Sequence, residues 1–186
     1  FDLISPFAYL FDAMLQRDPL PVALEYRPEQ FAGLLAAHAN KGPAEIPSKR
    51  RFTYRHCTWL AHHNGIAFAM PAAHPFNPIR HLRLLLAVGP TPARVSAAFR
   101  ALWTTGLDPA SDRSWEGFCA ALGADERAIA RIDAPEVKQA LHDNTAHAAR
   151  DGVFGVPTIA CRGELFWGVD ALPMLRAFVA DPDSNI

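Results

Sequence analysis

Apolar and polar positions at the start of the chain predict a strand, a helix and a second strand. Residues 1–4 are mainly apolar and read as the end of a buried strand. Apolar residues then recur with the spacing of an amphipathic helix, at Phe7, Leu10, Phe11, Met14 and Leu15. This helix is expected over residues 6–17, and residues 21–27 form the next strand candidate. The β-α-β order is typical of a parallel or mixed α/β sheet.

Strand signals nearly vanish between residues 29 and 150, and this region predicts a block of helices. The expected helices cover residues 31–39, 50–64, 78–88, 92–104, 114–122, 125–131 and 134–151. Ser114 and the pair Ala134-Pro135 are suitable helix starts. The tail returns to strands at residues 157–161 and 164–167, which Arg162-Gly163 joins as a hairpin candidate, and ends in a helix over 171–180.

This order of elements predicts an α/β protein with a thioredoxin-like fold and a large all-helical insertion. The thioredoxin-like domain is expected to be split between residues 1–40 and 150–186, with the insertion at 41–149. The chain begins within an apolar run and without Met, so we expect residues preceding Phe1 to be absent from this numbering.

Charge and cysteine content exclude several classes of function. The net charge is −1, and the longest basic run, Lys49-Arg50-Arg51, is too short for a nucleic-acid interface. No apolar stretch reaches the roughly 18 residues that a membrane span needs. The three cysteines lie far apart, which argues against a disulfide framework and favours a reducing cytoplasm. The eight histidines show no metal-ligand spacing, so no metal site is expected.

The pair Ser5-Pro6 stands where the first strand leads into the first helix. A serine hydroxyl at this position accepts a backbone N–H, and proline loses nothing at the first helical position, so a helix cap is a sufficient explanation. The same geometry favours an anion, because a helix N-terminus presents free N–H groups and the positive end of a dipole. A thiolate bound there must come with a ligand, since no cysteine is near.

Two further patches border the C-terminal strands. Residues 152–158, with the sequence G-V-F-G-V-P-T, predict a tight turn before a strand that begins at Pro157. Residues 167–170 place Asp170 at a helix start, where it either caps the helix or binds an ammonium group beside the helix N–H groups.

In this order, the patches resemble the 2-hydroxychromene-2-carboxylate isomerase family, relatives of kappa-class glutathione transferases within the DsbA-like thioredoxin fold. The resemblance covers nearly the whole chain. It rests on D-x-x-S-P-x-x-Y-L from Asp2, N-x8-K from Asn40 to Lys49, Pro75-Phe76-Asn77, Asn144-Thr145, G-V-F-G-V-P-T and F-W-G-x-D ending at Asp170.

The resemblance implies glutathione as the cofactor and gives each motif a role. Ser5 is implied to donate a hydrogen bond to the glutathione sulfur. Val156, before a cis-Pro157, is implied to pair its backbone with the cysteinyl unit. Val169 and Asp170 are implied to hold the γ-glutamyl end.

The inserted domain is implied to complete the site. Lys49 is expected to contact glutathione, and Asn40 and Phe7 are expected to contact an aromatic small-molecule substrate. From the residues alone, Lys49 is equally a solvated cation and Asn40 a helix C-cap. The family also implies a homodimer.

Three positions depart from the family pattern, and all bear on the substrate side. Ala8 replaces a second serine, and Phe52 and His56 replace a tyrosine and an aspartate. Three functions therefore compete: a glutathione-dependent isomerase, a kappa-type glutathione transferase that conjugates electrophiles, and a glutathione-binding module without activity. A dithiol oxidoreductase is the weakest alternative, because Ser5 and Ala8 stand where that chemistry needs cysteines.

Overall fold

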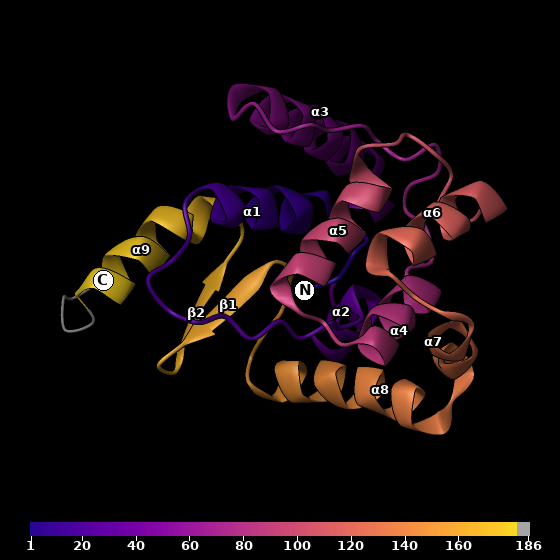
Figure 1. Cartoon of the computed structure of the whole chain (residues 1–186). Helices are drawn as coiled ribbons and strands as arrows, with labels where there is room; N and C mark the ends of the chain where they lie inside the picture. Colours follow the sequence, from indigo (N-terminus) through magenta and orange to yellow (C-terminus); the bar gives the residue numbers. More distant parts are fainter. Residues whose placement is uncertain (182–186) are drawn as a thin grey trace.

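The computed structural model describes residues 1–181 as a mainly helical molecule with one small sheet (Figure 1). Its elements, in chain order, are α1 (Pro6–Arg17), α2 (Phe31–Ala37), the 3₁₀ turn η1 (Pro43–Glu45), α3 (Pro47–His63), α4 (Ile79–Val88), α5 (Pro92–Trp103), α6 (Asp112–Leu122), α7 (Glu126–Ala130), η2 (Arg131–Asp133), α8 (Pro135–Arg150), β1 (Thr158–Cys161), β2 (Glu164–Trp167), η3 (Val169–Ala171) and α9 (Leu172–Ala180). Within residues 1–181, each helix is too short or too polar to span a membrane.

Helix α1 forms over the residues that the apolar spacing predicts, and it is the central packing element. Ser5 caps its N-terminus by accepting the Ala8 N–H at 3.2 Å. One part of the helix, including Tyr9 and Leu10, is buried against the helical block. Phe11 and Leu15 are buried instead against β2 and α9. The helix therefore joins the sheet region to the inserted helices.

The predicted strands at residues 1–4 and 21–27 are wrong, because both segments are irregular in the structure. The first turns sharply, with the Ser5 N–H donating to the Asp2 carbonyl at 3.2 Å. The second begins at Pro21, which has no N–H, and ends before Pro28, and the backbone of residues 22–26 forms no hydrogen bond within residues 1–181. The two segments still meet at one point, where Phe1 bonds to the carbonyl of Arg27 and the N–H of Glu29.

The predicted hairpin near the C-terminus is confirmed. Strands β1 and β2 pair antiparallel with Cys161 opposite Glu164. Arg162 and Gly163 form the connection with φ values of 52° and 90°. Two positive φ values are the mark of a type I′ turn, which suits the right-handed twist of paired strands.

The predicted block of helices is confirmed, with shifted boundaries. Helix α6 begins at Asp112 and is capped by Ser111, whose Oγ accepts from the Ser114 N–H at 3.3 Å, so Ser114 is not the cap that the sequence indicates. The three largest fully buried side chains, Trp103, Phe99 and Phe118, all belong to this block.

The core of the helical block continues into α1 without interruption. The division into residues 1–40 with 150–186 and 41–149 stays a prediction, and residues 182–186 lie outside the described part.

Candidate functional site

Ser5 lies at the junction of two segments that are distant in sequence. Its hydroxyl accepts the Ala8 N–H and points toward the carbonyl of Val156, at 3.5 Å from Oγ to oxygen. The side chain is 8% exposed. Both interpretations of Ser5 are therefore compatible with its geometry: it caps α1, and its proton faces the loop before Pro157. The long 3.5 Å contact is weak, so the hydroxyl can turn to a better acceptor at little cost.

Side chains of the helical block hold the backbone just before Ser5. The indole Nε1 of Trp103 donates to the Leu3 carbonyl at 2.9 Å. The ring Nε2 of His74 lies 2.9 Å from the Ile4 carbonyl. Neither residue is a sequence-predicted site residue, although the motif Pro75-Phe76-Asn77 marks the loop that carries His74. Sequence patterns reveal neither contact, because the two partners of each lie more than 65 residues apart in the chain.

The hydrogen bonds of His74 determine its tautomer. A carbonyl oxygen only accepts, so Nε2 carries the proton and Nδ1 is left to accept from the Tyr54 hydroxyl, 2.8 Å away. Burial lowers the pKa of His74, which favours this neutral form. The His74 ring thereby links the Tyr54 hydroxyl on α3 to the Ile4 carbonyl.

Asp2 fixes the turn that leads into α1. Its two carboxylate oxygens accept the Ile4 N–H at 3.0 Å and the Phe31 N–H at 2.8 Å, and the residue is 1% exposed. Burial raises the pKa of Asp2 to about 6, although both hydrogen bonds oppose that change. The aspartate of the D-x-x-S-P motif therefore has a structural role that spacing alone does not show.

The loop before β1 presents its backbone toward Ser5. The Val156-Pro157 peptide bond is cis, as predicted. The Val156 carbonyl faces Ser5, and its N–H finds no acceptor within residues 1–181. A Cβ on Gly155 would lie 2.5 Å from Nε1 of Trp167, so any other residue would have to displace the indole that covers the loop.

Val169 and Asp170 lie in the 3₁₀ turn η3, which packs against α1. Val169 is half-buried against the core, whereas Asp170 is exposed. The interpretation of Asp170 as a helix cap is wrong, because the cap position is Gly168 and no side chain accepts there. Asp170 forms no ion pair within residues 1–181, so its carboxylate is free to meet a ligand.

Asn40 and Lys49 both lie exposed, outside hydrogen-bond contact with Ser5 or Asp170. The Asn40 N–H donates to Leu35 at 2.9 Å and the Ala39 N–H to Ala36 at 3.2 Å, which closes α2 in a Schellman arrangement. The interpretation of Asn40 as the helix C-cap is wrong, because the C-cap is His38 and Asn40 stands two residues beyond it. Lys49 lies in the first turn of α3, which contains no acidic residue.

Phe7 links the Ser5 end of α1 to an aromatic row on α3. Its ring meets His56 edge to face, with centroids 5.6 Å apart, and His56 lies 5.6 Å from Phe52. Trp59 continues the row and stacks on His63 at 4.9 Å. Phe52 and Trp59 are 65% and 57% exposed. The departures Phe52 and His56 therefore belong to an aromatic row on α3 that reaches Phe7 of α1.

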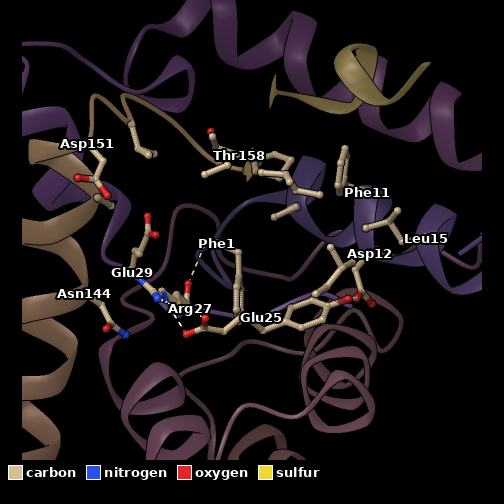
Figure 2. A pocket seen from close by; sticks show the side chains of 18 of the residues that line it. Phe1, Phe11, Asp12, Leu15, Glu25, Arg27, Glu29, Asn144, Asp151 and Thr158 are labelled. Atoms are coloured by element: carbon tan, nitrogen blue, oxygen red, sulfur yellow. Dashed lines mark hydrogen bonds and ion pairs between the residues drawn. The ribbon is translucent and has the colours of Figure 1, made fainter. Parts of the chain in front are cut away.

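Ser5, Val156 and the Phe7–His56 contact lie at the start of α1, and η3 packs against the same helix. The cavity of about 410 Å³ that Pro157 and Ala8 help to line is also lined by residues of β1 and of the segment 23–27 (Figure 2). Ser5, Val156 and Asp170 do not line it. We place the candidate site at the N-terminus of α1, where the Ser5 hydroxyl faces the Val156 carbonyl. Residues 1–181 contain no cluster of His, Cys, Asp and Glu suited to a metal ion.

Comparison with known proteins places these features in a family context. Residues 1–180 match the family model of the DSBA-like thioredoxin domain. The chain is 27% identical to 2-hydroxychromene-2-carboxylate isomerase of Sphingobium xenophagum, over 97% of this chain and 96% of that protein. It is 28% identical to the protein of the same name from Pseudomonas putida, over 95% of this chain and 90% of that protein.

More distant similarity extends to a kappa-class transferase and to a solved structure. Glutathione S-transferase kappa 2 of Caenorhabditis elegans is 24% identical over 98% of this chain and 90% of its own length. A solved 2-hydroxychromene-2-carboxylate isomerase superposes with a TM-score of 0.85 at 25% identity, over 97% of this chain and 92% of that one. The predicted thioredoxin-like fold is confirmed.

Proposed function

Because the chain belongs to the DSBA-like thioredoxin family, we propose that it is a glutathione-dependent isomerase of 2-hydroxychromene-2-carboxylate or a related aromatic-degradation intermediate. The observation that carries this proposal is Ser5, whose hydroxyl faces the Val156 carbonyl at the N-terminus of α1. Ser5 and Ala8 stand where a dithiol enzyme needs cysteines, so the sulfur must arrive with a ligand. The names of the similar isomerases support the reaction class.

The residues around Ser5 suit a bound thiol. The α1 N-terminus and the Ser5 hydroxyl both favour the anionic form of sulfur over the neutral form, which lowers a thiol pKa from its reference near ~8.5. When bound, glutathione would supply a thiolate that adds reversibly to a conjugated double bond and so permits rotation about it.

The backbone around Val156 fits the peptide part of glutathione. Its free N–H and its carbonyl offer one donor and one acceptor to an extended peptide. The exposed Asp170 would take the ammonium group of the γ-glutamyl end, with the backbone of Val169 beside it. Lys49 would take a carboxylate from the α3 side.

The substrate side is supported by aromatic and cationic side chains. Phe7, with His56 and Phe52 beside it, offers ring faces and edges to an aromatic substrate. The exposed Arg51, in the same stretch of α3 as Lys49, suits a carboxylate on that substrate. Asn40 would contact the substrate only from the rim, since its side chain bonds to the adjacent Lys41 N–H.

A kappa-type glutathione transferase is the second candidate, favoured by the similarity to the nematode transferase and to human glutathione S-transferase kappa 1, which is 24% identical. The two activities differ in what happens to glutathione: an isomerase regenerates it, whereas a transferase consumes one molecule per turnover. A count of free thiol during the reaction separates them. Binding without turnover would identify the third alternative, a non-catalytic module. The homodimer and the cytoplasmic location also stay proposals.

The decisive test compares two serine caps. Ser5→Ala removes one charge-assisted hydrogen bond of roughly 1.5–3 kcal/mol, so turnover should fall by about one to two orders of magnitude. The pKa of bound glutathione should rise, which is measured by the ultraviolet absorbance of the thiolate. Ser111→Ala is the matched control, because Ser111 also caps a helix, α6, which belongs to the helical block.

Both variants should lose about 1 kcal/mol of unfolding free energy through the lost cap. Only Ser5→Ala should change the thiol pKa and the rate. If the two variants behave alike in all three measurements, Ser5 is a cap and the proposed chemistry is wrong.

A further inference from the structure

The charged residues are distributed unevenly along the chain, although the net charge is only −1. Residues 46–107 contain eight of the 18 lysines and arginines and none of the 19 acidic residues. Four of these eight cations belong to α3: Lys49, Arg50, Arg51 and Arg55. None of the four forms an ion pair within residues 1–181. Like charges gathered on one helix repel each other, so α3 is a suitable place for an anionic ligand.

Arg50 differs from the other three cations of α3, because its side chain is already held in place. It is half-buried, whereas Lys49, Arg51 and Arg55 are exposed. Its Nε donates to the carbonyl of Ala44 in η1. Its two terminal amino groups find no acceptor among the residues that the structure describes. An arginine fixed at Nε presents these remaining donors as a planar fork, which is the geometry that binds both oxygens of a carboxylate.

A chain of hydrogen bonds places this part of α3 beside the turn that carries Ser5. Tyr54 follows Arg50 by one helical turn and therefore lies on the same face of α3. The Tyr54 hydroxyl lies 2.8 Å from Nδ1 of His74, and Nε2 of that ring donates to the Ile4 carbonyl at 2.9 Å. Ser5 is the next residue of the chain. One imidazole ring thus separates the Arg50–Tyr54 face of α3 from the backbone of the candidate site.

The charge of Arg50 acts on both side chains of this connection. Burial raises the pKa of Tyr54 and lowers the pKa of His74, and the positive charge of Arg50 lowers both. The guanidinium therefore lies near both rings, while the rings themselves stay neutral at pH 7. A carboxylate that meets the Arg50 fork would find a positive charge there and no acidic residue from the same stretch of the chain, 46–107.

We propose that Arg50 binds the carboxylate of a ligand that reacts at Ser5. This inference rests on the proposed function, which supplies two ligands of this chemistry: glutathione has a carboxylate at its glycine end, and the aromatic substrate is itself a carboxylate. Arg50 thereby adds to the exposed cations Lys49 and Arg51, whose side chains are not held by any hydrogen bond within residues 1–181. Because its fork is fixed before the ligand arrives, Arg50 loses less side-chain freedom on binding than they do.

The test measures binding by titration calorimetry, with three variants of the full chain. Arg50→Gln removes the charge, Arg50→Lys keeps the charge without the paired donors, and Arg55→Gln is the matched control on the exposed face of the same helix. Each variant is titrated with two pairs of probes, glutathione with its glycinamide form and salicylate with salicylamide. In each pair only the first member has the carboxylate in question.

The source of the carboxylate decides which pair responds. If it is the glycine end, Arg50→Gln should raise the Kd of glutathione by about tenfold or more and leave that of the glycinamide form unchanged. If it is the substrate, the same loss should appear for salicylate and not for salicylamide. Arg50→Lys should lose only part of this affinity, and Arg55→Gln should bind all four probes as the parent chain does. Should Arg50→Gln fail to fold, a loss of about three- to fivefold in Arg50→Lys, confined to one carboxylate, gives the same result.

Three outcomes would overturn the inference. In the first, Arg50→Gln binds both carboxylates as tightly as the parent chain. In the second, it binds a carboxylate and the matching amide equally weakly, which would mean that Arg50 only holds η1 against α3. In the third, the parent chain binds neither carboxylate. The proposed function is judged separately: a parent chain that does not bind glutathione contradicts it, whereas the salicylate pair still decides the role of Arg50.

Discussion

The sheet region and the inserted helices contribute to the candidate site in different ways. The sheet region offers mainly backbone: the N-terminus of α1, the Val156 peptide group and the turn η3. The inserted helices contain the largest buried side chains, and two side chains from this block, Trp103 and His74, bond to the carbonyls just before Ser5. The sheet region, which provides the backbone groups of the candidate site, is thus the region with the least regular strand pairing.

This difference shows how a reactive group can be held in place where strand pairing is sparse. Residues 3 and 4 have no strand partner, and their carbonyls are held instead by side chains from distant helices. A site made of backbone atoms tolerates changes of side chain at its own positions. It is sensitive to changes in the residues that support it.

The strongest test of this comparison removes one supporting hydrogen bond. Trp103→Phe deletes the indole N–H, leaves the buried Leu3 carbonyl without its donor and opens a small cavity. We expect a loss of about 2–4 kcal/mol in unfolding free energy, measured by urea denaturation. Trp59→Phe is the control, because Trp59 is 57% exposed, and it should stay within about 0.5 kcal/mol of the parent chain. Equal losses in both variants would contradict the supporting role.

A second prediction concerns the interior of the helical block, away from the site. His81 is 1% exposed, its two ring nitrogens have no partner, and the rings of Trp115 and Phe118 surround it. Replacing it with leucine removes an unpaired polar group. His81→Leu should therefore raise the unfolding free energy by about 1–3 kcal/mol at pH 7, with unchanged turnover.

The pH dependence sharpens the His81 prediction. Burial lowers the pKa of His81 to about 3, below the 6.5 of the unfolded chain. Its contribution to stability is present above pH 6.5 and is lost as pH falls, because only the unfolded state takes up the proton. At pH 5 the loss reaches roughly 2 kcal/mol. The advantage of His81→Leu over the parent chain should grow by that amount between pH 7 and pH 5, measured by urea denaturation.

Local signals in the sequence predict the elements whose hydrogen bonds join residues close together in the chain. Helix α1 has a cap, a proline at its first position and an apolar face within twelve residues, and its bounds are as predicted. The β1–β2 hairpin needs only a two-residue turn. The strands expected at residues 1–4 and 21–27 depend on pairing across the chain, and the second region begins at Pro21 and ends before Pro28.

The candidate site likewise contains features that local sequence signals predict and features that they do not. The cap geometry of Ser5 follows from the Ser-Pro pair, but its approach to Val156 spans 151 residues and was expected only from family resemblance. The motif Pro75-Phe76-Asn77 marks the loop that carries His74, but nothing in the sequence shows that His74 or Trp103 bonds to the carbonyls before Ser5. Exposure is equally non-local, so nothing in the motif reveals that Asn40 and Lys49 lie apart from Ser5.

A smaller effect is expected at Asp170, the exposed side chain of the candidate site. Asp170→Ala removes the proposed ammonium partner and leaves Ser5 unchanged. The apparent KM for glutathione should rise by about five- to tenfold, or roughly 1 kcal/mol, with nearly unchanged kcat at saturation. Stability should not change, since Asp170 is exposed. Glu164→Ala, another exposed carboxylate, is the control; a collapse of kcat in Asp170→Ala would show that its role is not binding.

The smallest effect lies at Ala39, which ends α2. Its φ is 50°, in the left-handed region where a Cβ is unfavourable, and it occupies the C′ position of the Schellman arrangement that glycine prefers. Glycine removes this strain but loses more entropy on folding, so Ala39→Gly should gain only about 0.5 kcal/mol. Ala36→Gly makes the same chemical change within the helix and should lose about 0.5–1 kcal/mol. Opposite signs in urea denaturation, with equal turnover, would support this assignment; equal losses would mean that Ala39 is not strained.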